Sequence, residues 1–125
     1  MALHVQLVED EPNIVVALTY LLERAGFEVS TETDGARALS AALARPPDVL
    51  ILDVTLPGLD GLEVLRQLRT DARGRTVPVI MLTAKGRVAD RESALGSGAD
   101  LYLTKPFSNA ELVAAVRRMA VAGAA

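Results

Sequence analysis

Side chains that can bind a cation or a phosphate group follow the apolar segments of this chain. The clearest case is LILDVTLPGLDG (Leu50–Gly61), in which an apolar segment ends directly on Asp53. A single carboxylate at such a position is usually only the polar residue that begins a loop. Whether Asp53 has a functional role therefore depends on which other residues lie near it. The other polar residues that follow apolar segments are Glu9, Asp10 and Glu11, then Thr83, then Thr104 and Lys105.

Together these side chains would suit phosphoryl transfer to a carboxylate. Crowded carboxylates repel one another, and oxygen ligands without His or Cys nearby favour Mg²⁺ or Mn²⁺ over zinc. Lysine supplies a charge and threonine a hydroxyl donor to phosphate oxygens, which leaves Asp53 to act as the nucleophile. Only two of the 13 basic residues are lysines, Lys85 and Lys105, so each is a candidate for a specific role.

The elements that must position these residues alternate between short apolar strands and amphipathic helices. Strands are expected at Leu3–Val8, Phe27–Thr33, Val49–Val54, Pro78–Leu82 and Leu101–Leu103. Helices are expected at Pro12–Ala25, from the cap residue Asp34 to Ala44, at Leu62–Asp71, at Val88–Leu95, and from a Ser108–Glu111 capping box to about Met119. This (βα)5 pattern predicts an α/β fold with a doubly wound, mostly parallel sheet. The carboxyl ends of parallel strands share one edge, so the polar residues should meet there.

Composition limits the function classes. The 125 residues fit one domain, 1–125, and no apolar stretch approaches the roughly 20 residues that cross a bilayer. The chain has no cysteine, no recognisable secretion signal, a net charge of −3 and few aromatic residues, so we expect a cytoplasmic protein with no direct contact to nucleic acid or membrane. The single histidine, His4, lies inside the first expected strand and is expected to be structural.

The whole chain resembles the receiver domain of bacterial two-component response regulators. The resemblance rests on LVEDE after the first strand, LDVTLPGLDG around Asp53, LTA at Leu82–Ala84, and GADLYLTKPF near the end. It implies a five-stranded sheet of flavodoxin-like order 2-1-3-4-5. It also implies that Asp53 accepts a phosphoryl group from a sensor histidine kinase or a phosphotransfer protein, so that the chain catalyses only its own phosphorylation and dephosphorylation.

The resemblance further implies a Mg²⁺ site beside Asp53. Asp10 would bind the ion directly and Glu9 mainly through water, while a carboxylate oxygen of Asp53 and the backbone carbonyl of Thr55 would complete the protein ligands. Glu9 stands where many members have Asp, which is a common variant that does not threaten metal binding.

The same resemblance assigns roles to residues around the phosphoryl group. Lys105 would pair with the carboxylate and then with the phosphoryl group, and Thr83 would move its hydroxyl onto it while Tyr102 rotates as a switch. Thr55, which stands where many relatives have methionine, and Lys85 would tune the lifetime of the phosphorylated state.

The output of the chain is expected on one face. The subfamily it resembles most heads winged-helix transcription factors, so a C-terminal DNA-binding domain outside this chain is an expected partner. That subfamily forms homodimers through its fourth helix, fifth strand and fifth helix, and two of the ion pairs could come from Arg91, Asp100, Glu111 and Arg117. Leu101 and Ala115 replace the acid and base of a third pair, which weighs against that dimer.

Rival functions on similar folds fit the residues less well. An aspartyl-phosphate phosphatase or phosphotransferase enzyme needs a second acid two residues after its nucleophile, and here that residue is Thr55. A flavin carrier needs a Ser/Thr/Gly-rich phosphate loop after the first strand, where this chain has three carboxylates, and the chain contains no P-loop motif.

Overall fold

The sheet has five parallel strands in the order β2-β1-β3-β4-β5. A computed structural model of the chain describes residues 3–84, 98–105 and 107–124. The strands are β1 (His4–Val8), β2 (Glu28–Glu32), β3 (Val49–Asp53), β4 (Val79–Ala84) and β5 (Leu101–Lys105). The predicted α/β class and strand order are therefore confirmed.

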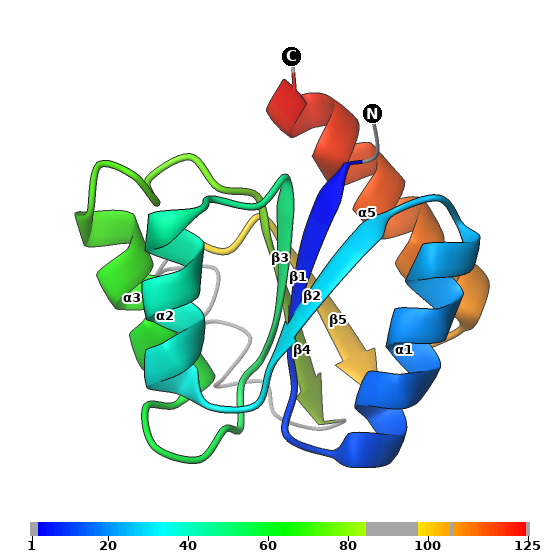
Figure 1. Cartoon of the computed structure of the whole chain (residues 1–125), viewed down its shortest axis with the longest axis horizontal. Coiled ribbons are helices and arrows are strands. Elements are labelled where there is room, and N and C mark those ends of the chain that lie inside the picture. Colours follow the sequence, from blue (N-terminus) through cyan, green and yellow to red (C-terminus); the bar gives the residue numbers. More distant parts are fainter. Residues whose placement is uncertain (1–2, 85–97, 106, 125) are drawn as a thin grey trace.

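Helices cover both faces of the sheet, as a doubly wound fold requires. Helices α1 (Pro12–Arg24) and α5 (Asn109–Ala124) lie on one face, and α2 (Gly35–Ala44) and α3 (Gly61–Thr70) lie on the other (Figure 1). The predicted helix at Val88–Leu95, together with Lys85 and Arg91, lies outside the described residues. No helix within the described ranges is both long and apolar enough to pass through a membrane.

Local signals in the sequence set the helix starts. The side chain of Asp34 accepts a hydrogen bond from the Arg37 amide at 3.0 Å, and Ser108 Oγ accepts one from the Glu111 amide at 3.0 Å, as both predicted caps require. Asp60 caps α3 in the same way, although the sequence analysis did not single it out. These side chains satisfy amide groups that the first turn of a helix leaves without partners.

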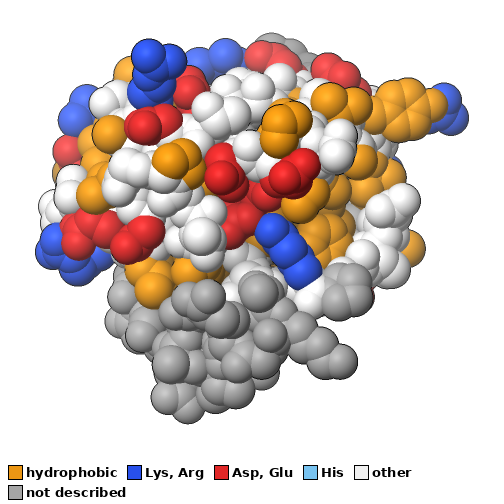
Figure 2. Space-filling model, turned by 90° about the horizontal axis from the view of Figure 1, so that it is seen from below, with side chains coloured by type: hydrophobic (Ala, Val, Ile, Leu, Met, Phe, Trp, Pro, Cys, Tyr) orange, Lys and Arg blue, Asp and Glu red, His pale blue; other side chains and the backbone are white. Residues whose placement is uncertain are grey.

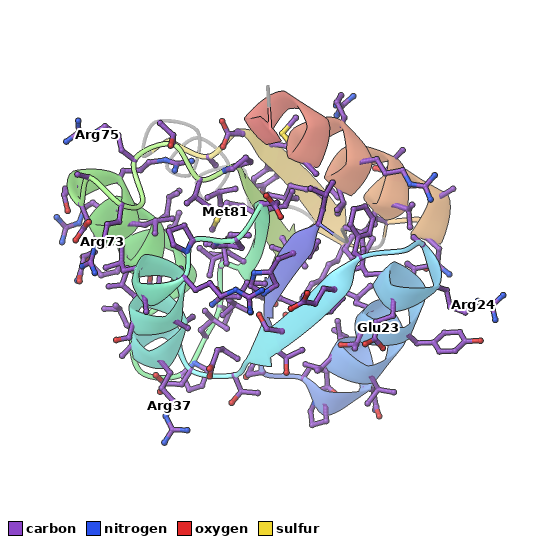
Figure 3. The ribbon with its side chains drawn as sticks, turned by 45° about the horizontal axis from the view of Figure 1, so that its top comes forward. Glu23, Arg24, Arg37, Arg73, Arg75 and Met81 are labelled. Carbon is purple, nitrogen blue, oxygen red and sulfur yellow. The ribbon has the colours of Figure 1, made fainter. Side chains whose placement is uncertain are left out.

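Successive side chains of each strand point to opposite faces of the sheet, so the interior consists of two apolar layers. Val49 and Ile51 of β3 face α1 and α5, whereas Leu50 and Leu52 face α2 and α3, and all four are fully buried. Each such side chain contributes about 1.5–3 kcal/mol relative to exposure. Figure 3 shows Met81 in the interior, while Arg24, Arg37, Arg73 and Arg75 point away from the body. A strand buried on both faces thus carries Asp53 at its tip.

Three elements extend further towards the carboxyl terminus than predicted. Strand β4 continues past Leu82 to Ala84, so Thr83 lies within the strand. Strand β5 continues past Leu103 because Thr104 and Lys105 still pair with Thr83 and Ala84 through the backbone, whatever their side chains. Helix α5 continues to Ala124 instead of ending near Met119, in keeping with the high helix propensity of its alanine-rich end.

The carboxyl ends of the strands form one edge, at the bottom of Figure 1 and facing the viewer in Figure 2. Helix α3 begins directly against this edge, because a Cβ at Gly61 would overlap the carbonyl oxygen of Asp53. The Gly61 amide donates to the Val54 carbonyl at 2.9 Å. Only glycine allows this close approach, which places the start of α3 beside Asp53.

Candidate functional site

Buried polar side chains divide between two places in the described structure. His4 and Gln6 have local partners: His4 Nε2 lies 2.7 Å from Ser30 Oγ, and Gln6 Nε2 donates to the Ala38 carbonyl at 3.1 Å. The contact with Ser30 is in keeping with the expectation that His4 is structural, and its Nδ1 has no hydrogen-bond partner among the described residues. The remaining buried polar residues, Glu9, Asp53 and Thr83, all lie at or just past the carboxyl ends of β1, β3 and β4.

Asp53 is held by a donor on each of its carboxylate oxygens. Its Oδ2 accepts a hydrogen bond from Lys105 Nζ at 2.7 Å, and its Oδ1 accepts one from the Thr55 amide at 2.8 Å. The residue is only 5% exposed. Charge-assisted hydrogen bonds of this kind fix the orientation of a carboxylate.

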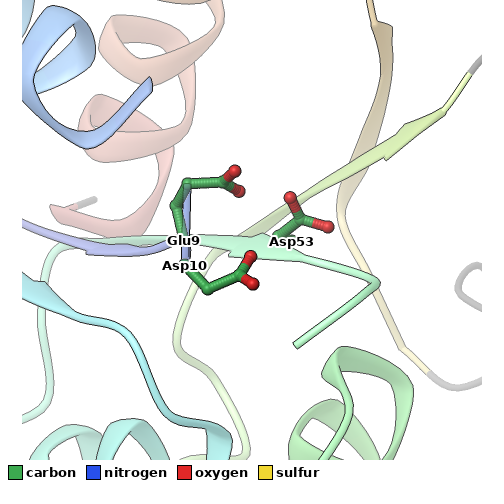
Figure 4. Close-up of side chains that lie close together, drawn as sticks. All are labelled: Glu9, Asp10 and Asp53. Atoms are coloured by element: carbon green, nitrogen blue, oxygen red, sulfur yellow. The ribbon is translucent and has the colours of Figure 1, made fainter. Parts of the chain in front are cut away.

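Two more carboxylates lie beside Asp53. Carboxylate oxygens of Glu9, Asp10 and Asp53 all lie within 4.8 Å of one another, and Figure 4 shows the three side chains converging. Lys105 Nζ is 3.6 Å from Glu9 Oε1. One ammonium group therefore faces two buried carboxylates, with the exposed Asp10 at the rim, and the cluster keeps an excess of negative charge.

The electrostatics of the cluster follow from this crowding. Burial, a hydrogen bond with Asp53 and the charge of Asp53 together raise the pKa of Glu9 from 4.5 to about 8. Burial alone would lower the pKa of Lys105, but its hydrogen bond and charge interaction with Asp53, supported by Glu9, outweigh burial and raise it. Lys105 is therefore a permanent cation at neutral pH, whereas Glu9 ionises reluctantly unless a further positive charge is present.

The cluster fits a small divalent cation. Its donors are carboxylate oxygens, and Glu9 Oε2 is buried without a hydrogen-bond partner among the described residues. Oxygen donors with excess negative charge, one side exposed through Asp10, are the arrangement that suits Mg²⁺, which keeps several waters when bound. The predicted ligand side chains are thus brought together by the fold.

The other predicted site residues on β4 and β5 lie close to this edge. Thr83 is 2% exposed, and its hydroxyl has no hydrogen-bond partner among the described residues. Tyr102 is partly buried and packs against the apolar layer under α2 and α3. A buried hydroxyl without a partner beside the carboxylate cluster is suited to receive a new acceptor group.

The predicted interface residues have partners within the chain. Asp100 Oδ2 accepts hydrogen bonds from Arg69 Nη2 at 3.0 Å and from the Val79 amide at 2.8 Å. Arg117 Nη2 donates to the Ala25 carbonyl at 3.3 Å, and Glu111 is exposed on the first turn of α5. Among the described members of this set, Asp100, Glu111 and Arg117 form no ion pairs with one another, so use of Asp100 between subunits would require it to share its carboxylate with Arg69.

An apolar hollow beside the site was not predicted from the sequence. It has a volume of about 340 Å³ and is lined by Asn13, Ile14, Ala17, Leu18, Lys105 and Phe107. Hydrophobic side chains flank the carboxylate cluster on this edge of the molecule (Figure 2). On the outside of α1, Val16 and Tyr20 are 70% and 64% exposed. Their spacing of four residues on a helix was the signal that could have drawn attention to this face.

A parallel five-stranded sheet with a carboxylate cluster and a lysine at its carboxyl edge defines a receiver domain. The family model for the response regulator receiver domain matches residues 5–117, and the chain belongs to this family. Its relatives include the alkaline phosphatase synthesis transcriptional regulatory protein PhoP of Bacillus subtilis, 47% identical over 119 residues, and the phosphate regulon transcriptional regulatory protein PhoB of Rhizobium meliloti, 46% identical over 115 residues. Each alignment covers 92% of this chain but 49% and 51% of those proteins, so the chain spans about half their length.

Solved structures agree with this assignment. A response regulator from Chloroflexus aurantiacus matches with a TM-score of 0.92 at 34% identity, covering 97% of this chain and 99% of that one. The receiver domain of the sensor histidine kinase PA1611 from Pseudomonas aeruginosa, which has magnesium in its active-site cleft, matches with a TM-score of 0.90 at 36% identity and the same coverage. The predicted family is confirmed, and these comparisons give no support to an aspartyl-phosphate phosphatase.

We expect Glu9 to make the metal-free protein less stable as the pH rises. Because its pKa is higher in the folded chain than the ordinary 4.5, the folded state keeps a proton that the unfolded state releases. This contribution to stability is fully present below pH 4.5 and is lost as the pH rises to about 8. With a chelator present, Glu9→Gln should remove this part of the pH dependence and gain roughly 1–3 kcal/mol at the upper end of that range.

Urea unfolding at both ends of this pH range measures the effect. Glu23→Gln, which neutralises an exposed carboxylate on α1, is the matched control and should keep the wild-type pH dependence. Equal pH dependence in Glu9→Gln and wild type would contradict the assigned protonation of Glu9.

Proposed function

We propose that Asp53 is the phosphoryl acceptor of this receiver domain. The observation that carries the proposal is the Asp53 carboxylate, oriented by Lys105 Nζ at 2.7 Å and the Thr55 amide at 2.8 Å beside an unneutralised acidic cluster. A carboxylate oxygen of Asp53 attacks the phosphorus of a phosphohistidine. The P–N bond breaks, an acyl phosphate forms, and the released imidazole nitrogen takes a proton from water.

The acidic cluster would hold the metal that this reaction needs. Carboxylates of Glu9, Asp10 and Asp53 with the Thr55 carbonyl would bind Mg²⁺, or Mn²⁺ in its place, and the bound ion would neutralise charge on the transferring phosphoryl oxygens. The magnesium in the cleft of the similar PA1611 receiver domain supports this reading. Lys105 moves from the Asp53 carboxylate to the phosphoryl oxygens as the negative charge shifts.

Phosphorylation of Asp53 should be specific and metal-dependent. Incubation with a small acyl phosphate and Mg²⁺ is expected to add one phosphoryl group, detected as a mass increase of the intact chain. Asp53→Asn keeps the shape of the side chain but removes the nucleophile, so it should abolish the addition, and a chelator should do the same to wild type. Asp48→Asn, at the opposite end of the sheet, is the control that should still be labelled.

Labelling that survives both Asp53→Asn and chelation would overturn the assignment of the acceptor. Labelling that survives Asp53→Asn alone would place the phosphoryl group on another carboxylate of the cluster.

We further propose that Thr83 passes the phosphorylation signal to Tyr102. The Thr83 hydroxyl is buried without a partner among the described residues and can donate to a phosphoryl oxygen on Asp53. Tyr102 lies on β5, whose backbone pairs Thr104 with Thr83, so a shift at Thr83 reaches the β5 edge directly. The signal would then be read on the face of β5, α5 and the predicted helix at 88–95.

The chain's two tyrosines provide a test of this coupling. Beryllofluoride with Mg²⁺, which mimics the phosphoryl group, should shift the ring signals of Tyr102 in NMR spectra and leave those of Tyr20, which is exposed on α1, almost unchanged. Thr83→Ala removes the donating hydroxyl and should abolish the Tyr102 shift while beryllofluoride still binds. A full Tyr102 shift in Thr83→Ala would contradict the proposed route.

The phosphoryl donor is proposed to dock over the apolar hollow beside Lys105. The hollow opens next to the acceptor and is continuous with α1, where Val16 and Tyr20 are exposed. A sensor histidine kinase or phosphotransfer protein with an apolar patch near its phosphohistidine would fit this hollow.

The output of the chain is proposed by analogy with its relatives. The relatives named as transcriptional regulators are about twice as long as this chain, and we propose a DNA-binding output domain and a cytoplasmic location by analogy with them.

Filling the hollow should slow transfer from a protein donor only. Ala17 is exposed and lines the hollow, so Ala17→Arg blocks it without entering the core. Transfer from a phosphorylated donor protein should fall by about tenfold, equivalent to about 1.4 kcal/mol, while labelling by a small acyl phosphate stays unchanged. Ala36→Arg, which adds the same side chain to exposed α2, should leave both rates as in wild type. A parallel loss of both rates in Ala17→Arg would contradict docking at this hollow.

The lifetime of the acyl phosphate is proposed to depend on Thr55 and Lys85. Thr55 is exposed next to Asp53, where its side chain is too short to position an attacking water and carries no carboxylate. Slow self-dephosphorylation is therefore the expected behaviour of this receiver domain.

A further inference from the structure

Arg69, at the end of α3, binds several backbone carbonyls far from the phosphoryl site. Its side chain is only 16% exposed. The Nε donates to the Gly98 carbonyl at 2.9 Å, Nη1 to the carbonyls of Gly74 at 2.9 Å and Val77 at 2.7 Å, and Nη2 to Asp100 Oδ2 at 3.0 Å. Five donors on a planar group make arginine able to hold this many acceptors at once.

Asp100 ties the start of β5 to the start of β4. Its amide donates to the Val79 carbonyl at 3.0 Å, and its Oδ2 accepts from the Val79 amide at 2.8 Å. This two-point contact sets Asp100 opposite Val79, directly before the first paired residues of the two strands, Ile80 and Leu101. Arg69 reinforces this contact from both strands. It binds the carbonyl of Gly98, two residues before Asp100, and the carbonyl of Val77, two residues before Val79.

The register of β5 needs such a device. Within the described residues β5 pairs only with β4, at the edge of the sheet, and Leu103, which is 7% exposed, is its single buried residue. A weak apolar pattern at an edge leaves the register poorly specified, and a slip of one residue turns every side chain to the opposite face. Such a slip would turn the side chain of Lys105 to the opposite face of the sheet, away from Asp53. The side chain of Tyr102 would move to the face that Lys105 now occupies.

We infer that Arg69 and Asp100 are positioning residues for Lys105. This inference rests on the proposed function, in that Lys105 is taken to act on the phosphoryl group at Asp53. The pair fixes the β4–β5 register at the amino end of β5, and the parallel ladder carries that register to Ala84 and Lys105 at the other end.

The strands that carry the proposed metal ligands do not depend on β5 for their pairing. Glu9 and Asp10 follow β1, and Asp53 ends β3, and these two strands pair with each other without involving β5. A misplaced β5 should therefore slow phosphorylation without weakening Mg²⁺ binding, because moving the Lys105 ammonium away from Asp53 and Glu9 removes a cation that competes with the metal for these carboxylates. Loss of overall stability would instead weaken both.

Asp100→Ala provides the test, with phosphorylation by a small acyl phosphate and Mg²⁺ affinity measured side by side at a temperature where the chain remains folded. We expect the phosphorylation rate to fall by roughly tenfold and Mg²⁺ affinity to stay the same or rise. In a Lys105→Ala background, Asp100→Ala should cause no further loss, because both changes remove the same interaction. Asp100→Asn, which keeps an acceptor for Val79 and Arg69, should restore most of the rate.

Two more variants keep the test decisive if Asp100→Ala does not fold. Arg69→Lys keeps the charge but cannot hold all the acceptors, so it should show the same split between rate and Mg²⁺ affinity. Arg66→Ala breaks an exposed ion pair with Glu63 on the same helix and should leave both quantities as in wild type. Parallel loss of rate and Mg²⁺ affinity, or an additive loss in the Lys105→Ala background, would overturn the inference. Failure of wild type to be labelled at all would overturn the proposed function itself.

Discussion

The ion pair between Lys105 and Asp53 is the interaction on which the site depends. Glu9 and Asp53 are removed from water at the ends of two central strands, where two adjacent negative charges would repel each other strongly. Burial and this repulsion raise the pKa of Glu9 to about 8. Burying charges costs more than their attraction returns unless partners with good geometry are present. A single ammonium group, 2.7 Å from Asp53 and 3.6 Å from Glu9, provides that partner. It leaves the cluster negative, which is why the site suits a divalent cation.

The sheet imposes a geometric condition on this pair. Asp53 is opposite Leu82 of β4, while Lys105 is opposite Ala84, so the lysine lies two residues further along the sheet than Asp53. Its long side chain must therefore cross the end of β4 to reach β3. Asp53 sits on a strand buried on both faces, and its position is secure; Lys105 sits on an edge strand with few buried side chains. The polar contacts at the start of β5 compensate for that weakness.

Two buried oxygen atoms at the carboxyl edge, Glu9 Oε2 and Thr83 Oγ, have no hydrogen-bond partner among the described residues. His4 Nδ1 and Thr19 Oγ also lack partners, away from this edge, so a missing partner does not by itself mark a site. At Glu9 and Thr83 the open atoms adjoin a carboxylate cluster with excess negative charge, and this combination points to a ligand that completes them. The apolar hollow next to Lys105 adds a surface where a protein partner can approach the same carboxylate.

The sequence by itself determined the fold class and most of the site. Alternating strands and helices, the cap residues Asp34 and Ser108, and the polar residues after the strands suffice to predict a parallel sheet with Asp53 at its carboxyl edge, because periodicity and capping are local properties. The tertiary structure alone decided the rest. The pairing of Lys105 with Asp53 was expected from the family resemblance, but the contact of the Thr55 amide with Asp53, the contacts of Asp100 with Arg69 and Val79, and the hollow beside α1 all depend on strand register and helix packing. Those are distances between residues far apart in the chain, which no local pattern records.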